Sequence, residues 1–262
     1  MCRAMIVWGD KKRAMTMLVA AYEKGNKDGF FVGAYKKGEY LAIRTLEIWD
    51  AIEFIAENEA ERWDLHARAA THGGVLEKWV HGWEGEANGI VWRLWHNGIG
   101  AAIHENDSYD AFQTILKHMN EGMKPWEAMV EASKKLYMSG VYMMGNTEED
   151  EVYVYAVDKI VHIRAGKTTI AVSSVDDVFQ KKIELKIAVP KKTWGEVTLW
   201  TRETIKMEAE EPLPYKGELG YGVWKLSKNG AKFMEDVPED RIVPKYEKTP
   251  KYSYYGGGYK WM

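Results

Sequence analysis

Cys2 is the only cysteine of the chain and directly follows Met1. Removal of Met1, for which Cys2 is small enough, would leave a thiol and a free α-amine on one residue. An α-amine has an ordinary pKa of about 7.7–8.0, so it can take up and return a proton near neutral pH. Cys2 would then combine nucleophile and base, as N-terminal threonine nucleophiles do. Elsewhere in a chain, a lone cysteine is usually a small buried hydrophobe.

Three short segments after Cys2 carry further polar chemistry. Two of them are expected at strand ends and one at a helix start: Arg68-Ala69-Ala70-Thr71-His72-Gly73, His96-Asn97-Gly98-Ile99 and Asn106-Asp107-Ser108. Each is ordinary alone, because Asn-Gly is a common turn and Asp or Ser commonly caps a helix. Together, in this order behind a second-position cysteine, they are hard to obtain by accident.

With the opening Met1-Cys2-Arg3, these segments resemble in kind and order the class II glutamine amidotransferases. The motifs cover roughly residues 2–110, and a weaker likeness continues at 168–174. The resemblance implies the N-terminal-nucleophile (Ntn) hydrolase fold, an α+β four-layer αββα sandwich of antiparallel sheets. It also implies an amidohydrolase that splits the side-chain amide of glutamine through a thioester, releasing ammonia and glutamate. His81 looks like the family's histidine between the two main motifs.

The resemblance assigns the catalytic roles to three residues. Cys2 would attack the amide, and the side-chain amide of Asn97 and the backbone N–H of Gly98 would donate to the oxyanion. One such donor is worth roughly 3 kcal/mol in the transition state. Glycine permits the close backbone approach that this position needs.

The resemblance also assigns the binding of the zwitterionic substrate. Arg68 would hold the α-carboxylate in a bidentate pair, Thr71 and His72 would assist from the adjacent turn, and Asp107 would hold the α-ammonium. Nine residues separate Asn97 from Asp107, an interval in which the family commonly places a helix. Glu105 and Asp110 are therefore alternatives to Asp107.

Two further departures widen the range of substrates. Ala69 stands where many family members carry Trp, and Trp79-Val80-His81-Gly82 replaces the usual Asn-Ala-His-Pro. The substrate is therefore free glutamine or a γ-glutamyl amide.

Composition excludes several other classes of function. A net charge of −3 over 262 residues gives no reason to expect nucleic acid or an anionic membrane as partner. No apolar run is long enough to span a membrane, and the N-terminus lacks a signal-peptide pattern, so we expect a cytoplasmic protein. A single cysteine rules out an internal disulfide and a cysteine-rich zinc site. We expect no metal and no cofactor, because neither a ligand cluster nor a nucleotide-binding loop is visible.

Hydrophobic periodicity predicts alternating blocks of strands and helices. Helices are expected at 11–24, 47–60, 107–118 and 125–137, and strands at 3–8, 30–35, 40–46, 63–70, 90–95, 141–144, 152–157, 160–164, 168–172, 183–189 and 196–201. Residues 75–90 are expected to form a loop. The four strands between 141 and 172 are expected to form one antiparallel meander, and Asp107-Ser108 to cap the third helix.

The chain divides into one domain at 2–243 and a flexible tail at 244–262, which is rich in Tyr, Gly and Lys and has no Ile, Leu or Val. Residues 185–262 are too few for a synthase domain, so ammonia would go to a separate synthase subunit or the chain would be a free-standing amidohydrolase. Two alternatives stay open. One is another N-terminal-cysteine amidase that acts on acyl amides, and the other is a non-catalytic interaction module on the same fold.

Overall fold

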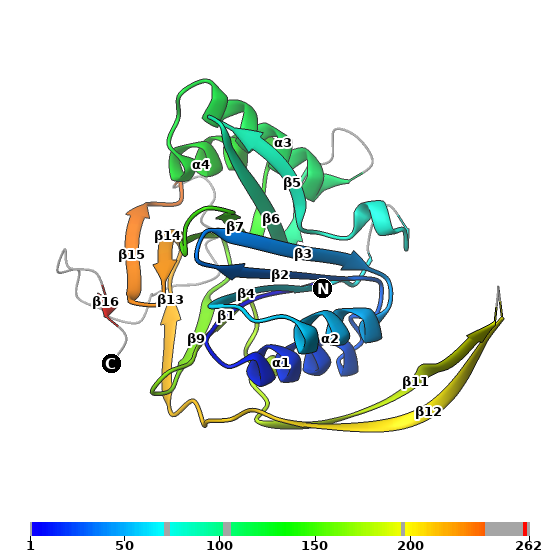
Figure 1. The fold of residues 1–262 in the computed structure, drawn as a ribbon. Coiled ribbons are helices and arrows are strands. Elements are labelled where there is room, and N and C mark those ends of the chain that lie inside the picture. Colours follow the sequence, from blue (N-terminus) through cyan, green and yellow to red (C-terminus); the bar gives the residue numbers. More distant parts are fainter. Residues whose placement is uncertain (1, 71–73, 102–105, 195–196, 239–258, 261–262) are drawn as a thin grey trace.

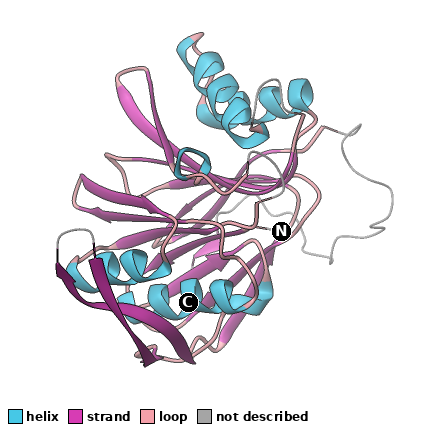
Figure 2. Cartoon of the chain, turned by 90° about the vertical axis from the view of Figure 1, so that its right-hand side faces the viewer, coloured by secondary structure: helices cyan, strands magenta, loops and turns pink. Residues whose placement is uncertain are grey.

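The computed structural model describes residues 2–70, 74–101, 106–194, 197–238 and 259–260. Two antiparallel sheets lie face to face, and a pair of helices covers the outer face of each (Figure 1). The turned view in Figure 2 shows the helix pairs on opposite sides, with the strands between them. This is the four-layer αββα sandwich that the family resemblance implies.

The first sheet has seven strands in the order β13-β9-β10-β1-β4-β2-β3, and its neighbours pair antiparallel. Its strands are β1 (Arg3–Trp8), β2 (Phe30–Lys36), β3 (Glu39–Thr45), β4 (Arg62–Ala67), β9 (Val161–Ala165), β10 (Ile170–Ser173) and β13 (Tyr215–Leu219). The N-terminal strand β1 is therefore central, held between β10 and β4.

The second sheet also has seven strands, in the order β16-β15-β14-β8-β7-β6-β5. Its strands are β5 (Trp83–Ala87), β6 (Ile90–Ile99), β7 (Ser139–Asn146), β8 (Val152–Ala156), β14 (Gly222–Ser227), β15 (Gly230–Glu235) and β16 (Tyr259–Lys260). Here β6 lies next to the outermost strand β5, and β7 lies on its other side.

Three separate apolar cores correspond to the three spaces between the four layers. α1 (Lys11–Glu23) and α2 (Ile48–Glu57) pack on the first sheet, and α3 (Asp107–Asn120) and α4 (Pro125–Leu136) pack on the second. Side chains of β1 alternate between two of these cores. Met5 and Val7 join the helices, whereas Ala4, Ile6 and Trp8 join the core between the sheets. Both faces of β1 are buried, so the strand holds Cys2, the residue that precedes it, in a fixed position.

Helix ends follow the expected capping chemistry. The Asp10 side chain accepts a hydrogen bond from the Lys12 N–H at 2.8 Å at the start of α1, which satisfies one of the unpaired donors of the first turn. Pro125 opens α4, where its missing N–H costs nothing.

Several predicted elements differ from the structure. Residues 75–90 are not a loop throughout, because they contain a short 3-10 helix η1 (Glu77–Trp79) and strand β5. The expected meander is wrong, because β7 and β8 belong to the second sheet, whereas β9 and β10 belong to the first. The predicted strand 63–70 ends at Ala67.

Beyond Ser173, a second short 3-10 helix η2 (Asp176–Val178) precedes a long hairpin. Its strands β11 (Lys182–Trp194) and β12 (Val197–Glu208) pair with each other and project from the body of the molecule (Figure 1). In the predicted tail, Tyr259–Lys260 pairs with β15, and the rest of 244–262 lies outside the described residues. Among the described helices, none is long and apolar enough to cross a membrane.

Candidate active site

Cys2 lies at the end of the central strand pair of the first sheet. Arg3 of β1 pairs with Ala67 of β4, so Cys2 and Arg68 stand beside each other just beyond the paired ends. The half-buried Cys2 thiol donates a hydrogen bond to the Ala69 carbonyl at 3.6 Å. Burial raises the pKa of this thiol, and the Asp107 carboxylate raises it further, whereas the Arg68 guanidinium opposes the shift.

One pocket opens at this point between the two sheets. Its lining consists of Cys2, Arg68, Ala69, His81, Gly98, Asn106, Asp107 and Ser108. Four of the residues singled out in the sequence as catalytic or binding therefore meet in one place, although they come from separate elements. Thr71, His72 and Glu105 lie outside the described residues.

Gly98 sits inside β6, opposite Gly140 of β7. The predicted end of the strand at His96-Asn97-Gly98 is wrong, because β6 continues to Ile99. A Cβ at position 98 would lie 1.8 Å from the Ser139 carbonyl oxygen and 2.5 Å from His96 Nε2. A side chain is therefore excluded, and the glycine keeps β6 and β7 close together under the pocket.

Asn97 is fully buried and reaches across to the first sheet. Its Nδ2 donates to Ser174 Oγ at 2.9 Å, and the same hydroxyl oxygen accepts the backbone N–H of Ala4 at 3.0 Å. Asn97 Oδ1 has no hydrogen-bond partner among the described residues. An amide oxygen buried without a partner costs roughly 1–3 kcal/mol, so the orientation of this amide bears on function.

Arg68 is a buried cation beside the thiol, with 2% of its surface exposed. Its Nη1 donates to the Gly74 carbonyl at 2.6 Å. Burial lowers the pKa of this guanidinium, and the charges of Cys2, Asp28 and Asp107 oppose that shift. The guanidinium remains charged at any physiological pH.

Asp107 is the first residue of α3, not its cap. The cap is Asn106, whose Oδ1 accepts the Tyr109 N–H at 3.0 Å, and this corrects the prediction that Asp107-Ser108 caps the helix. Asp107 Oδ2 accepts the Gly100 N–H at 2.9 Å, and its Oδ1 accepts the Ser108 N–H at 2.8 Å. Asp110, the alternative, is buried on α3 and does not appear in the described lining of the pocket.

Three buried histidines form a stack at the pocket, and one of them, His81, lines it. The rings of His66 and His81 are 3.9 Å apart and nearly parallel, and His81 and His96 are 6.0 Å apart. Burial lowers the pKa of His66 to about 3 and that of His96 to about 4, and it lowers the pKa of His81 well below 6.5. All three are therefore neutral near pH 7.

Hydrogen bonds fix which ring nitrogen carries each proton. His66 Nε2 donates to the His96 carbonyl at 3.0 Å, because a carbonyl can only accept. His81 Nδ1 accepts the His96 N–H at 3.1 Å. His96 donates from Nε2 to the Ser139 carbonyl at 3.3 Å, which leaves Nδ1 to accept from the Ser108 hydroxyl at 2.7 Å.

His66 is a site residue that the motif reasoning missed, and His96 belongs to a quoted motif that gave it no role of its own. His66 is two residues before Arg68, and residues two apart on a strand share a face. Because Arg68 is assigned to the site, the two-residue spacing is a signal in the sequence that His66 lies on the same face. The place of His96 in the stack could not be predicted from its motif, since it depends on contacts between the two sheets.

Comparison with solved structures bears on the fold. The glutamine phosphoribosylpyrophosphate amidotransferase from B. subtilis, complexed with ADP and GMP, superposes with a TM-score of 0.61 at 14% identity, over 89% of this chain. A glutamine aminotransferase class-II domain protein from Silicibacter pomeroyi superposes with a TM-score of 0.50 at 16% identity, over 90% of this chain and 100% of its own. The chain has the fold of the class II glutamine amidotransferases.

The similarity to the amidotransferases lies in the fold and not in the overall sequence. A further solved structure, described as the allosteric regulatory enzyme of purine biosynthesis, gives a TM-score of 0.60 at 13% identity. The chain spans about half of the length of this protein and of the B. subtilis one, 49% in each case. No family model and no curated protein matches the sequence.

Proposed function

We propose that the chain is a glutamine amidotransferase-type amidohydrolase with Cys2 as its nucleophile. The observation that carries this proposal is the meeting of Cys2, Arg68, Gly98 and Asp107 in one pocket. They supply a thiol, a cation, a close backbone approach and a carboxylate within one amidotransferase fold. Hydrolysis of a zwitterionic amide requires that combination.

The reaction begins once cleavage before Cys2 has freed its α-amine. The amine takes the thiol proton, and the thiolate attacks the amide carbon to form a tetrahedral intermediate. Collapse of that intermediate breaks the C–N bond, and the ammonium returns the proton so that ammonia leaves. Water then adds to the thioester with the amine as base, and glutamate and the free thiol are regenerated.

The oxyanion of each tetrahedral intermediate needs N–H donors, which we assign to Gly98 and Asn97. In the orientation described above, Asn97 Nδ2 points at Ser174 and Oδ1 is left without a described partner. The opposite amide orientation lets the Ser174 hydroxyl donate to Oδ1, since Ser174 Oγ already accepts from Ala4. Nδ2 is then free to donate to the oxyanion. Ser174 is thus a positioning residue for Asn97.

The head group of the substrate is held by opposite charges. Arg68 binds the α-carboxylate through its planar fork, and the Asp107 carboxylate binds the α-ammonium. Both residues line the pocket with Cys2, and both act electrostatically on the thiol. Thr71 and His72 follow Arg68 in the chain, and we keep them as proposed contacts to the carboxylate.

The substrate is glutamine or a γ-glutamyl amide, and the ammonia passes to a separate synthase subunit where one is present. The B. subtilis protein that shares this fold is named for glutamine and phosphoribosylpyrophosphate, and about half of its length has no counterpart here.

The proposal is tested by measuring glutamate release from protein whose N-terminus begins at Cys2. We expect turnover of glutamine or of a γ-glutamyl amide, and loss of turnover in Cys2→Ala without loss of fold. Acyl amides serve as the comparison, because an N-terminal-cysteine amidase of the other kind would prefer them. Absence of hydrolysis of every γ-glutamyl amide by fully processed protein would contradict the proposal.

A further inference from the structure

Cys2 and two histidines form a cluster that the proposed reaction does not use in full. The Cys2 sulfur and ring nitrogens of His66 and His81 all lie within 4.8 Å of one another. Thiolate and imidazole are the ligands that zinc prefers. His66 is completely buried, and its Nδ1 has no hydrogen-bond partner within the part of the chain that the structure describes.

The hydrogen bonds of the two histidines show that His66 can act as a metal ligand and that His81 cannot. A metal-bound histidine characteristically donates its other ring N–H to a carbonyl or carboxylate. His66 meets that requirement, because its Nε2 donates to the His96 carbonyl at 3.0 Å and its Nδ1 keeps a lone pair. His81 does not, because its Nδ1 accepts the His96 N–H at 3.1 Å and the ring proton therefore sits on Nε2.

We propose that this cluster binds a zinc ion through the Cys2 thiolate, His66 Nδ1 and the α-amine of Cys2. The amine and thiol of one cysteine close a five-membered chelate ring, and His66 supplies a third ligand from the neighbouring strand. Binding displaces the thiol proton, and the proton of the α-ammonium where that group is charged. The fourth position of a tetrahedral site is left for water.

A metal in this position holds the enzyme inactive, because it occupies both the nucleophile and the base. The functional consequence rests on the proposed role of Cys2, whereas metal binding itself rests only on the free terminus and the geometry. The site is not dominated by positive charge, since the Asp107 carboxylate acts on the Cys2 sulfur together with the Arg68 cation.

Cobalt substitution measures the binding without reference to activity. Titration of processed protein with Co²⁺ is expected to give one equivalent bound, with tetrahedral ligand-field bands and a thiolate-to-cobalt charge-transfer band. His66→Gln keeps a donor for the His96 carbonyl but removes the ligand, so we expect binding weaker by at least about 100-fold. The matched variant His81→Asn keeps an acceptor for the His96 N–H and should retain the charge-transfer band.

X-ray absorption on the wild-type zinc complex provides a readout that needs no variant. One sulfur ligand and at least one imidazole are expected, and a zinc site without sulfur would overturn the proposal. Equal loss of cobalt binding in both histidine variants, each shown folded by circular dichroism, would also overturn it, as would unchanged binding in His66→Gln. Metal binding without glutaminase activity would support the metal site and refute the proposed reaction. If the metal site and the reaction are both correct, zinc should inhibit glutamate release and a chelator should reverse that inhibition.

Discussion

The paired strands β1 and β4 carry a buried arginine at each end, and the two arginines differ in how the protein surrounds them. Arg62 opens β4 opposite Trp8, and Arg68 follows β4 beside Cys2. Both are almost completely buried, at 0% and 2% exposure. One end of the strand pair is a structural anchor, and the other is the candidate active site.

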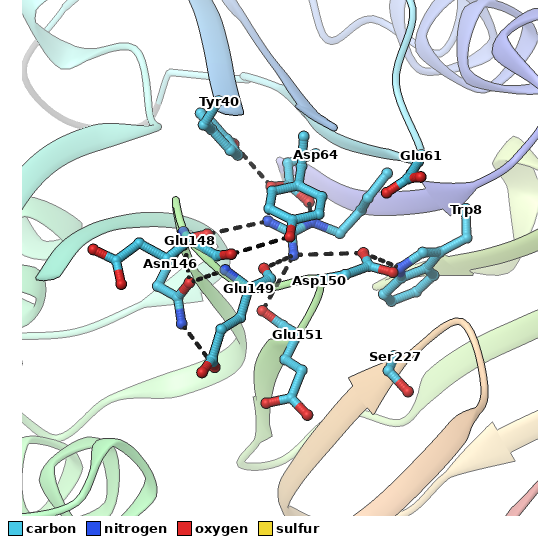
Figure 3. A network of polar contacts seen from close by, with 12 residues as sticks. Trp8, Tyr40, Glu61, Asp64, Asn146, Glu148, Glu149, Asp150, Glu151 and Ser227 are labelled. Atoms are coloured by element: carbon cyan, nitrogen blue, oxygen red, sulfur yellow. Dashed lines mark hydrogen bonds and ion pairs between the residues drawn. The ribbon is translucent and has the colours of Figure 1, made fainter. Parts of the chain in front are cut away.

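At the anchor end, every nitrogen of the Arg62 guanidinium has an acceptor. Asp64 accepts from Nε at 3.0 Å and from Nη2 at 3.1 Å, and backbone carbonyls of the 146–151 turn accept the rest. Tyr40 donates to Asp64 at 2.8 Å, and Trp8 donates to Asp150 at 2.8 Å. Figure 3 shows these partners converging from several elements between the sheets.

At the pocket end, two buried polar side chains each have one atom that makes no hydrogen bond among the described residues. Asn97 Oδ1 and His66 Nδ1 have no partner among the described residues, and both belong to fully buried side chains. A buried polar atom without a partner is destabilising. The anchor end also leaves one such atom, Asp150 Oδ2, so the difference lies in position. At the pocket end, His66 is clustered with Cys2, where a substrate or a metal ion can take up the unused capacity.

The largest expected effect breaks the anchor. Arg62→Met leaves Asp64 buried without its counter-charge, so the free energy of unfolding should fall by about 3–5 kcal/mol, as measured by denaturant titration. The double variant Arg62→Met/Asp64→Leu should recover much of that loss, because it removes both charges. A KM that rises in the folded single variant, with little loss of stability, would place Arg62 in the function and break the comparison.

Next in size is Asn97→Ala, which removes a proposed oxyanion donor. We expect kcat to fall by about 10²–10³-fold with KM nearly unchanged, because the interaction forms only in the transition state. Steady-state kinetics on glutamine check this. A change confined to KM would assign Asn97 to substrate binding instead.

Arg68→Lys keeps the charge but removes the fork that grips a carboxylate. The expected loss in kcat/KM is about 10- to 100-fold, mostly through KM, with a much smaller stability change than Arg62→Met produces. If Arg68→Lys instead destabilises the fold and leaves KM unchanged, Arg68 is a structural residue like Arg62, and the proposed difference between the two ends of the strand pair is wrong.

Acid sensitivity should come from the histidine stack. The pKa of His66 is about 3 in the folded protein and near 6.5 in an unfolded chain. Between these values the unfolded state binds more protons, so stability falls as pH falls through this window. In the presence of a chelator, His66→Gln should reduce the slope of unfolding free energy against pH by about 1.4 kcal/mol per unit. An unchanged slope would show that His66 is already protonated when folded.

The smallest expected effect sharpens the assignment of Ser174. Ser174→Ala removes the donor that we propose orients the Asn97 amide, and one hydrogen bond of this kind corresponds to about a 10-fold loss in kcat. Ser174→Thr should restore the rate, because it keeps the hydroxyl. Equal rates for alanine and wild type would show that Asn97 needs no partner to be oriented.

The resemblance carried by the motifs implies the fold class, and hydrophobic periodicity predicts most elements before residue 173. It fails at β5, where Trp83 and Ala87 are buried and Glu84 and Glu86 are exposed. That alternation was present, but glycine and glutamate are poor strand formers, and pairing with β6 overrides the local preference. The Asn97-Gly98 turn signal fails for the same reason, because β7 pairs with both residues.

Other features depend on contacts that no local pattern reports. Asp158-Lys159 separates the predicted strands 152–157 and 160–164, but these two residues do not reveal that the chain crosses there from the second sheet to the first. The partnership of Asn97 with Ser174 joins residues 77 positions apart. By contrast, the family resemblance points to Cys2, Arg68 and Asp107 from their motifs alone, and the pocket brings them together.

The most direct test of the central claim is the mass of the N-terminal peptide after treatment with a glutamine-analogue electrophile. Protein beginning at Cys2 should gain one adduct, located on Cys2, and glutamine added in excess should protect it. Protein that retains Met1 should gain none, because its α-amine does not lie on the cysteine. A correctly processed N-terminus that stays unlabelled, in protein that releases no glutamate, would contradict the account.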